Sequence, residues 1–447
     1  MRLIEWSSKA DVARYSEGNE GGCIKQHLNL TRLHGEREYI RQGFVHRIDG
    51  IWAIVTRTQN ANRARAISLE DGSTLWLSED IAPPPSDSSQ ISQIGFGDID
   101  ADGSPEAVLA SYEGDVICLS ADDGSVKWQI RLPWHINNPR LDLKRASAGS
   151  GLNIALTVGN DHDWTRGHSR PRINFVRNPS LVLIGPDGDH NIVADRYDSD
   201  NGNGHNTWMY DIDEDGICEI CCNGSKGVHW FRHDGEALFS LPCTGEESHP
   251  DSVLAFNWLP DREGKEIFYL DGISGIAMAD NRGRILRRMR FSHAQASHLQ
   301  ELRIFEGDDG PILLAENIRD RDSKLLCFNH KLEMIWGAWT ATDLYGCMSM
   351  EWDDDGEDEI VCGSHGRGLF NPRGAEECSF HVMARDGTPL YWHRWSGDTL
   401  CHPLAIADVD DDGRPEAIIS VGTNGGPEGR YSLSPGHSEH IFVMGEE

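Results

Sequence analysis

Histidine or tyrosine stands at one fixed distance ahead of three of the four acidic loops in this sequence, and serine ahead of the other. Six residues before the first acidic residue of each loop stand Ser92, His205, Tyr345 and His402. Imidazole and phenol groups can transfer protons, and imidazole can also bind metal ions. A single histidine would more often be a hydrogen-bonded residue of the fold. Equivalent positions in separate repeats instead predict that these side chains converge on one site.

Fainter copies of the same pattern add further polar residues. Asp251 lies near the same offset in a fifth copy, and His249 lies two residues earlier, hence on the same face of a strand. The candidates from the first and sixth copies are Tyr39, His293, Gln295 and His298.

The four loops themselves follow an Asp-x-Asp-x-Asp-Gly pattern, with Glu351 in place of the first aspartate in the third loop and a glutamate shortly after each glycine. Alternating carboxylates with a glycine for the tight turn can bind calcium, although the same residues also turn hairpins without a metal. We expect calcium in at least one loop, and we expect the loops to serve the scaffold and not the chemistry. The candidate ligands are Asp98, Asp100, Asp102, Asp211, Asp213, Asp215, Asp353, Asp355, Asp408, Asp410 and Asp412.

The spacing of these loops predicts the fold. Each loop precedes a short apolar strand, and weaker copies lie near Gly50, Gly264 and Gly310 and at residues 150–159. A second signal alternates with the first: an Asp-Gly turn followed by an apolar strand that often contains tryptophan, as in SADDGSVKW. Two interleaved hairpin signals repeating at roughly 45 to 60 residues are typical of four-stranded propeller blades, which bury both faces against neighbouring blades.

Counting the copies predicts an all-β, eight-bladed β-propeller in one domain spanning residues 1–447, with seven blades as the alternative. The N-terminal segment or the C-terminal HIFVM strand should complete a blade and cover its edge. In such a fold the polar residues ahead of the loops begin the innermost strands and surround the central channel.

Composition excludes several classes of partner. The 447 residues carry a formal net charge of −31, which argues against nucleic acid or an anionic membrane as a partner. No apolar stretch is long enough to span a membrane, and no export signal is visible, so we expect a soluble, cytoplasmic protein with reduced thiols. The pair Cys218 and Cys221 should point to opposite strand faces and is not expected to bind zinc. The oligomeric state is left open.

Basic residues gather in one long segment of this acidic chain. Residues 134–177 exceed an ordinary blade loop and are expected to form an insertion that walls a cleft or decorates a rim. Its basic residues favour an anionic sugar as the ligand. The candidate substrate-binding arginines are Arg166 and Arg170 in this insertion and Arg367 in SHGRGLF.

The segment GHNTWMYDIDEDGICEI, with the later SHPDSVLAFNWLPDREGKEIFYLDG, resembles the rhamnogalacturonan lyases of polysaccharide lyase family eleven. The resemblance covers residues 203–272 and implies an eight-bladed, calcium-rich propeller with a metal site at the substrate cleft. It carries over His205, His249 and Asp251 as ligands, with Asp271 one residue away from the expected spacing. Calcium is the divalent metal expected first, and the two imidazoles add manganese, zinc or iron as alternatives at this site. The HAQ at 293–295 is more similar to ulvan and rhamnose-glucuronate lyases.

These features predict cleavage of a uronate-containing oligosaccharide by β-elimination. A metal or an arginine would neutralise the uronate carboxylate, while histidine or tyrosine would act as base and acid. His293, Tyr345 and His205 are the catalytic candidates. The substrate contacts are expected from Gln295, His298, His402, Tyr39 and the three arginines. The alternatives are an integrin-like calcium-binding propeller that only recognises a glycan or protein, and a hydrolase on the same scaffold.

Overall fold

The computed structural model describes residues 2–5, 24–29, 43–58, 63–79, 91–111, 114–136, 141–146, 151–159, 161–162, 176–177, 179–198, 206–224, 226–244, 250–292, 299–307, 310–317, 323–340, 343–365, 377–396, 400–422 and 440–445. All regular elements within these ranges are β-strands. The chain divides into two compact units, one formed by Met1–Thr56, Ile67–Leu75 and Ala294–Glu447, the other by Arg57–Ala66 and Trp76–His293. We call them unit 1 and unit 2.

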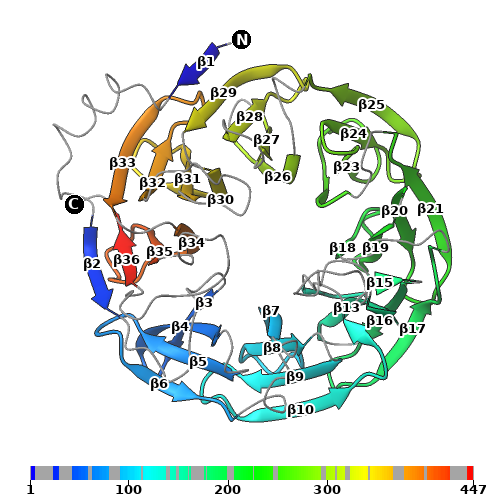
Figure 1. Ribbon diagram of the computed structural model, residues 1–447, viewed down its shortest axis with the longest axis horizontal. Helices are drawn as coiled ribbons and strands as arrows, with labels where there is room; N and C mark the ends of the chain where they lie inside the picture. Colours follow the sequence, from blue (N-terminus) through cyan, green and yellow to red (C-terminus); the bar gives the residue numbers. More distant parts are fainter. Residues whose placement is uncertain are drawn as a thin grey trace. The chain divides into compact units, whose positions relative to one another are not determined.

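Unit 2 contains four antiparallel blades, each a sheet in which successive strands pair (Figure 1). The first has β7 (Ile91–Gly97), β8 (Glu106–Ser111), β9 (Asp115–Ser120) and β10 (Val126–Arg131). The second has β11 (His135–Ile136), β12 (Asp142–Lys144), β13 (Asn153–Gly159), β16 (Ser180–Ile184) and β17 (His190–Ala194), with a ribbon of β14 (Asp161–His162) and β15 (Val176–Arg177). The third has β18 (Thr207–Tyr210), β19 (Glu219–Gly224), β20 (Gly227–Phe231) and β21 (Ala237–Pro242). The fourth has β22 (Val253–Phe256), β23 (Glu266–Leu270), β24 (Gly275–Ala279) and β25 (Ile285–Arg290).

The other four blades belong wholly or mostly to unit 1. One has β3 (Gly43–Ile48), β4 (Ile51–Thr58), β5 (Arg63–Ser68) and β6 (Thr74–Leu77). The next has β26 (Leu299–Phe305), β27 (Ile312–Asn317), β28 (Ser323–Phe328) and β29 (Met334–Thr340), with β1 (Arg2–Glu5) parallel to β29. The third has β30 (Asp343–Glu351), β31 (Asp358–His365), β32 (Glu377–Met383) and β33 (Pro389–Ser396). The last has β34 (Leu400–Ala407), β35 (Glu416–Gly422), β36 (His440–Met444) and β2 (Ile24–Asn29).

The last blade joins the two ends of the described chain. Its fourth strand is β2, which pairs antiparallel with β36 from Ile24 opposite Met444 to Asn29 opposite His440. The N-terminal segment or the HIFVM strand was expected to complete a blade, and the structure shows that both do so in the same blade.

Two kinds of connection recur in the blades, as the sequence predicted. The acidic loops join the first and second strands, and the Asp-Gly turns join the third and fourth. Both therefore lie at one end of a blade, and the first strand begins at the other end. The weak copy at Gly50 is different: Asp49 and Gly50 both have positive φ (50° and 86°) and form a two-residue turn between β3 and β4.

The cores lie between neighbouring blades. In unit 2, for example, Trp208 and Trp230 of one blade pack with Tyr269 of the next. Cys221 belongs to this cluster, whereas Cys222 and Cys218 pack on the other side of the same blade. The opposite orientation expected for Cys218 and Cys221 is confirmed, and burial raises the pKa of both thiols.

Tryptophans of the outer strands form hydrogen bonds to neighbouring blades. The indole N–H of Trp128 in β10 donates to the carbonyl of Pro186 in the next blade at 2.8 Å, and Trp336 in β29 donates to that of Arg385 at 2.7 Å. Glycine lets the following turn pack on the ring: a Cβ at Gly188 would lie 3.2 Å from Trp128. These contacts explain why tryptophan and Asp-Gly recur together in the sequence.

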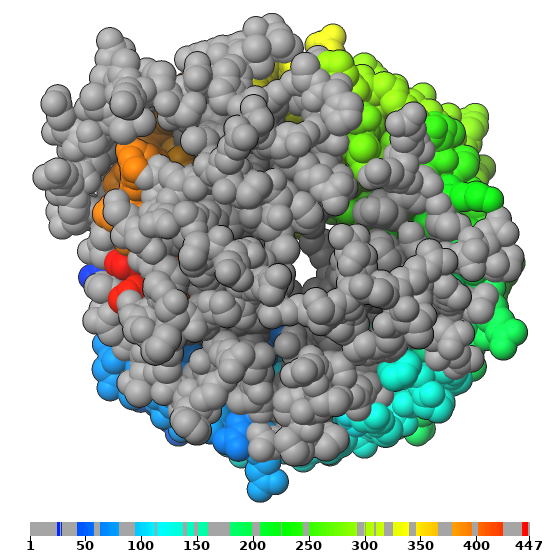
Figure 2. Space-filling view, viewed as in Figure 1, coloured from blue at the N-terminus to red at the C-terminus, as the bar shows by residue number. Residues whose placement is uncertain are grey.

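The outer strands also carry most of the exposed strand residues. β10 and β25 alternate partly buried with exposed side chains, and described atoms of both lie at the surface in Figure 2 (cyan and yellow-green). Within the described residues, no helix is long and apolar enough to cross a membrane.

Candidate functional site

The starts of the inner strands β18 and β22 are tied together by one amide, that of Asn223. Its side-chain oxygen accepts a hydrogen bond from the backbone N–H of Asn206 at 2.9 Å, and its side-chain nitrogen donates to the carbonyl of Pro250 at 3.2 Å. The Asn206 side chain donates to the carbonyl of Asp251 at 3.3 Å. Asn223 is fully buried, so these bonds are shielded from water. The structure thus brings together Asn206 and Pro250, which directly follow the predicted metal ligands His205 and His249 in the sequence.

Two of the four predicted ligands at this end of the blades are described. Asp251 lies just before β22 with a partly exposed side chain. Asp271 is completely buried and accepts hydrogen bonds from Arg288, from Arg290 at 3.0 Å and from the backbone N–H of Thr244 at 2.6 Å. The guanidinium groups of Arg288 and Arg290 neutralise this carboxylate and donate hydrogen bonds to it. In the structure these contacts anchor Asp271 within its blade, and its predicted role as a ligand stays a prediction.

Nine other candidates fall outside what the structure describes. Those outside the described residues are Tyr39, Arg166, Arg170, His205, His249, His293, Gln295, His298 and Arg367. Their roles remain predictions.

Tyr345 and His402 lie near the starts of two inner strands of unit 1, β30 and β34. Gly346 follows Tyr345 with φ of 68°, and a Cβ at this glycine would lie 3.3 Å from Cε1 of His402. The backbone of β30 therefore passes directly beside the His402 ring, and glycine permits this approach. Both residues thus lie near the starts of inner strands, and their roles stay predictions.

The long basic segment also belongs to this end of its blade. Within residues 134–177, β11, β12 and β13 are part of the blade itself, so the inserted part is the connection between β13 and β16. A connection between second and third strands lies at the end where the first strand begins. The ribbon of β14 and β15, which includes His162, forms its base.

The four acidic loops share one backbone conformation at the opposite end of the blades. The fourth loop residue has a positive φ of 60–64° in each, at Ala101, Glu214, Asp354 and Asp411. The eighth residue after the first acidic position is a buried glutamate that accepts a hydrogen bond from the N–H of the second loop residue. These pairs are Glu106 with Ile99, Glu219 with Ile212, Glu359 with Trp352, and Glu416 with Val409.

Carboxylates of each loop gather closely enough to hold a divalent metal. The groups are Asp98, Asp100 and Glu106; Asp211, Asp213 and Glu219; Glu351, Asp353 and Asp355; and Asp408, Asp410 and Glu416, with ligand atoms within 4.8 Å of one another. The inner strand separates a loop from the opposite end of its blade: Asn206 and Asp211 are five residues apart, or about 16 Å at about 3.3 Å per residue. A metal in a loop therefore cannot reach the site beside Asn223.

Charge is balanced differently among the loops. In the first, Lys127 lies among the carboxylates; burial alone would lower its pKa, but hydrogen bonds to Glu106, Asp100 and Asp102 raise it above the usual value. In the second, burial raises the pKa of Glu219 to about 7, and the charge of Asp213 adds to this. Burial likewise raises the pKa of Glu359 to about 7 in the third loop.

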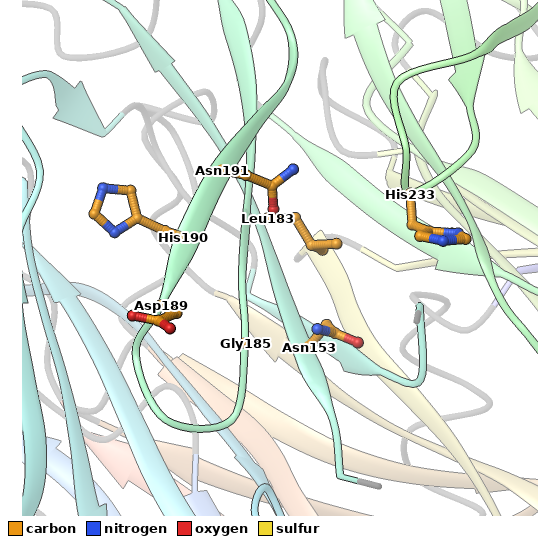
Figure 3. A pocket seen from close by; sticks show the side chains of 7 residues that line it. All are labelled: Asn153, Leu183, Gly185, Asp189, His190, Asn191 and His233. Atoms are coloured by element: carbon orange, nitrogen blue, oxygen red, sulfur yellow. The ribbon is translucent and has the colours of Figure 1, made fainter. Parts of the chain in front are cut away.

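A cavity of about 370 Å³ opens beside β16 and β17, lined by Asn153, Leu183, Gly185, Asp189, His190, Asn191 and His233. Its polar groups do not converge. His190 and Asn191 project to opposite sides of β17, and His233 lies across the cavity from both (Figure 3). The cavity therefore offers neither a metal cluster nor an acid–base pair.

Comparisons with known proteins report on the fold. No protein-family model and no curated protein match the sequence. Solved structures do match. Sqt1 of Saccharomyces cerevisiae has a TM-score of 0.60 and 11% sequence identity, over 93% of this chain and 98% of that chain. The computationally designed Ika8 protein has a TM-score of 0.57 and 12% identity, over 94% of this chain and 98% of that chain, and BamB of Moraxella catarrhalis has a TM-score of 0.52 and 11% identity, over 94% of this chain and 99% of that chain. The chain is an eight-bladed β-propeller. At these identities the likeness shows the fold alone.

Asn206 and Asn223 are the site residues that sequence reasoning missed in this propeller. Asn223 ends an apolar strand, and a buried asparagine there is a signal for a hydrogen-bonding role. Its partners come from other strands, so the sequence alone does not identify them.

Proposed function

We propose that the protein is a lyase that cleaves a uronate-containing, rhamnogalacturonan-like oligosaccharide by β-elimination. The metal-binding residues in this proposal are His205, His249 and Asp251. The observation that carries it is the set of hydrogen bonds by which Asn223 binds Asn206 and Pro250, and Asn206 binds Asp251. We call this set the Asn223 clamp. His205 and His249 each adjoin a clamped residue in the chain. Two imidazoles and one carboxylate suit manganese, zinc or iron.

The reaction breaks the C–H bond beside the uronate carboxylate and the C–O bond to the leaving sugar, and a C=C bond forms between the two carbons. A divalent metal, when bound, would neutralise the carboxylate and so acidify that proton. Tyr345 and His293 are the candidates for taking this proton and for protonating the leaving oxygen, with His205 as the further catalytic candidate. Gln295, His402 and the basic insertion would contact the anionic sugar.

Calcium is the ion proposed for the acidic loops, because hard carboxylate oxygens are its preferred ligands. These ions would stabilise the scaffold, since the loops lie about 16 Å along the strand from the clamped residues. The propeller would thus carry two kinds of metal site with separate roles.

A panel of pectic, ulvan-type and glucuronate-capped oligosaccharides tests the activity. The unsaturated uronate product absorbs in the near ultraviolet, so a rise in absorbance on one member of the panel is the expected result. Saturated products would indicate a hydrolase, and glycan binding without turnover would indicate a recognition propeller; either result would contradict the proposal.

Variants test the residues separately from the reaction class. His205→Ala should abolish turnover and metal binding, and Tyr345→Phe should lower kcat by about 10²–10⁴-fold with metal binding unchanged. Asn223→Leu should weaken metal affinity by about 10–100-fold, as expected for a residue that positions ligands. The control is Asn153→Leu in the preceding blade, which removes a buried side-chain oxygen that accepts a hydrogen bond from the N–H of Ala146 in its own blade. Equal metal affinity in the Asn223 and Asn153 variants would exclude the clamp as a positioning element.

A further inference from the structure

The four acidic loops differ at one neighbouring position, the extra residue of a β-bulge in the fourth strand of the same blade. At this bulge, two residues of the fourth strand face one residue of the third. The bulge residues are Lys127 in β10, Leu238 in β21, Leu390 in β33 and Lys25 in β2. The strand register makes the four positions equivalent, so two loops have a lysine where two have a leucine.

The lysine of unit 2 reaches into the loop beside it. Nζ of Lys127 donates to Asp100 at 2.9 Å, to Asp102 at 3.0 Å and to Glu106 at 2.5 Å. These bonds use all three N–H donors of the ammonium group. The cation therefore lies among the carboxylates of this loop, where a metal ion would bind.

Unit 1 repeats this arrangement with a strand from the other end of the chain. Nζ of Lys25 donates to Asp410 and Asp412 at 3.0 Å each and to Glu416 at 2.5 Å. The three carboxylates stand at the same loop positions as those around Lys127. Two lysines far apart in the sequence thus make the same contacts.

Among the described residues, no lysine or arginine pairs with the grouped carboxylates of the two loops beside leucine, and these loops keep unsatisfied carboxylate oxygens. Oδ1 of Asp211 and Oε1 of Glu351, each from the first loop position, are buried and have no hydrogen-bond partner among the described residues. The carboxylates of Glu219 and Glu359 are buried in the same loops, with residue exposures of 4% and 2%. Buried, unpaired carboxylate oxygens are costly, and a cation is the partner that would satisfy them.

We propose that Lys127 and Lys25 are built-in cations that take the place of a metal ion, and that calcium binding is confined to the loops of Asp211 and Glu351. The bulge residue then decides which kind of loop a blade has. This inference rests on the proposed calcium binding of the loops and does not depend on the lyase reaction. Each unit contains one loop of each kind, so calcium should stabilise both units.

A fifth loop agrees with this interpretation. In the blade of β22–β25 the loop keeps one aspartate, Asp261, and Nε of Arg262 lies 3.7 Å from Oε1 of Glu266, the glutamate equivalent to Glu106. The bulge residue there is Leu286. Where the bulge supplies no cation and the set of three aspartates is incomplete, the loop itself supplies one.

Exchange of the bulge residues tests the proposal. Chelator-treated protein is titrated with calcium alone by calorimetry, and terbium luminescence serves as a second readout. Lys127→Met should bind one more calcium ion per chain than the wild type, and Leu238→Lys should bind one fewer. Lys127→Met should also unfold at a lower temperature in chelator and regain stability in millimolar calcium.

Lys25→Met and Leu390→Lys repeat the exchange in unit 1, so that misfolding of one variant does not decide the result. Asp213→Asn removes a carboxylate from the second acidic loop, and so tests calcium binding by the loops separately from the role of the lysines. If Asp213→Asn loses a calcium ion while the bulge exchanges change nothing, the role of the lysines is wrong and the calcium loops stand. If neither the wild type nor Lys127→Met binds calcium in a loop, both ideas fail.

Discussion

His381 shows how one buried side chain can couple the stability of this propeller to pH. Its residue exposure is 2%, and its Nε2 lies 2.7 Å from Oγ of Ser379, which lies 2.8 Å from Oγ of Ser364. Burial lowers the pKa of His381 to about 3. The unfolded chain, with a histidine pKa of about 6.5, therefore binds a proton that the folded protein does not accept between these values.

The sign of the effect follows from this difference. The contribution of His381 is fully present above about pH 6.5 and is lost as the pH falls toward 3, at up to about 1.4 kcal/mol per pH unit. His381→Gln keeps a hydrogen-bonding group beside Ser379 but cannot titrate. Between pH 6.5 and 4.5, the free energy of unfolding of the wild type should fall by about 2 kcal/mol more than that of His381→Gln, as measured by denaturant titrations.

The same substitution at the exposed His190 provides the control, which should keep the pH dependence of the wild type. Parallel curves for the wild type and His381→Gln would show that the buried imidazole does not set the acid stability.

At the scale of the elements, glycines in the turns are required for two different reasons that can be separated by experiment. Gly103 in an acidic loop and Gly124 in an Asp-Gly turn belong to one blade and have φ of 92° and 72°. A Cβ at Gly103 would have nothing within 4 Å, whereas one at Gly124 would lie 2.5 Å from the ring of Trp76. Both positions carry backbone strain for alanine, but only Gly124 adds a steric clash.

Gly103→Ala should therefore cost about 1 kcal/mol through backbone strain alone. Gly124→Ala should cost about 1–3 kcal/mol more, because the ring packed on the turn must move. Thermal and denaturant unfolding of the two variants would measure the difference. Equal losses would mean that the contact between Trp76 and the turn contributes little to stability.

Sequence reasoning predicted the blades because their signals are local. The acidic loop and the Asp-Gly turn each lie within about a dozen residues, so repetition alone indicates hairpins and their order. It failed at Gly50, where an Asp-Gly pair forms a hairpin turn and no acidic loop. It also missed the lysines in the acidic loops, because Lys127 is 21 residues from Glu106 and Lys25 is 391 residues from Glu416. Each lysine is placed beside its loop by a β-bulge.

The candidate site was predictable only as a set of equivalent positions. The offset ahead of the loops identified the ends of the inner strands, and the proximity of Gly346 to His402 agrees with it. Contacts across strands, such as those of Asn223 with Asn206 and Pro250, depend on register and packing that a single sequence does not encode locally. The same limit explains Asp271, whose arginine partners lie on β25.

At the scale of the whole molecule, the last blade depends on a strand from the opposite end of the chain. β2 covers the edge of β36, places Lys25 in the last acidic loop, and buries Leu28 with Ile418 and Ile441. Gln26 adds a hydrogen bond from its side chain to the carbonyl of Glu70 at 2.7 Å. Without β2, the paired backbone of β36 would become an exposed strand edge, which promotes pairing with other chains.

Removal of residues 1–29 should therefore destabilise unit 1 and cause self-association. Loss of the Leu28 burial and of the β2–β36 hydrogen bonds should together cost about 5 kcal/mol, or roughly 10 °C or more in Tm. Removal of residues 1–23 is the matched control, because it removes β1 as the longer truncation does but keeps β2, so that the last blade should still unfold cooperatively. Calorimetry and sedimentation of the two proteins, with a peptide of residues 24–29 added to the shorter one, would test this. Closure by β2 would be refuted if both truncations unfolded at the same temperature and sedimented alike.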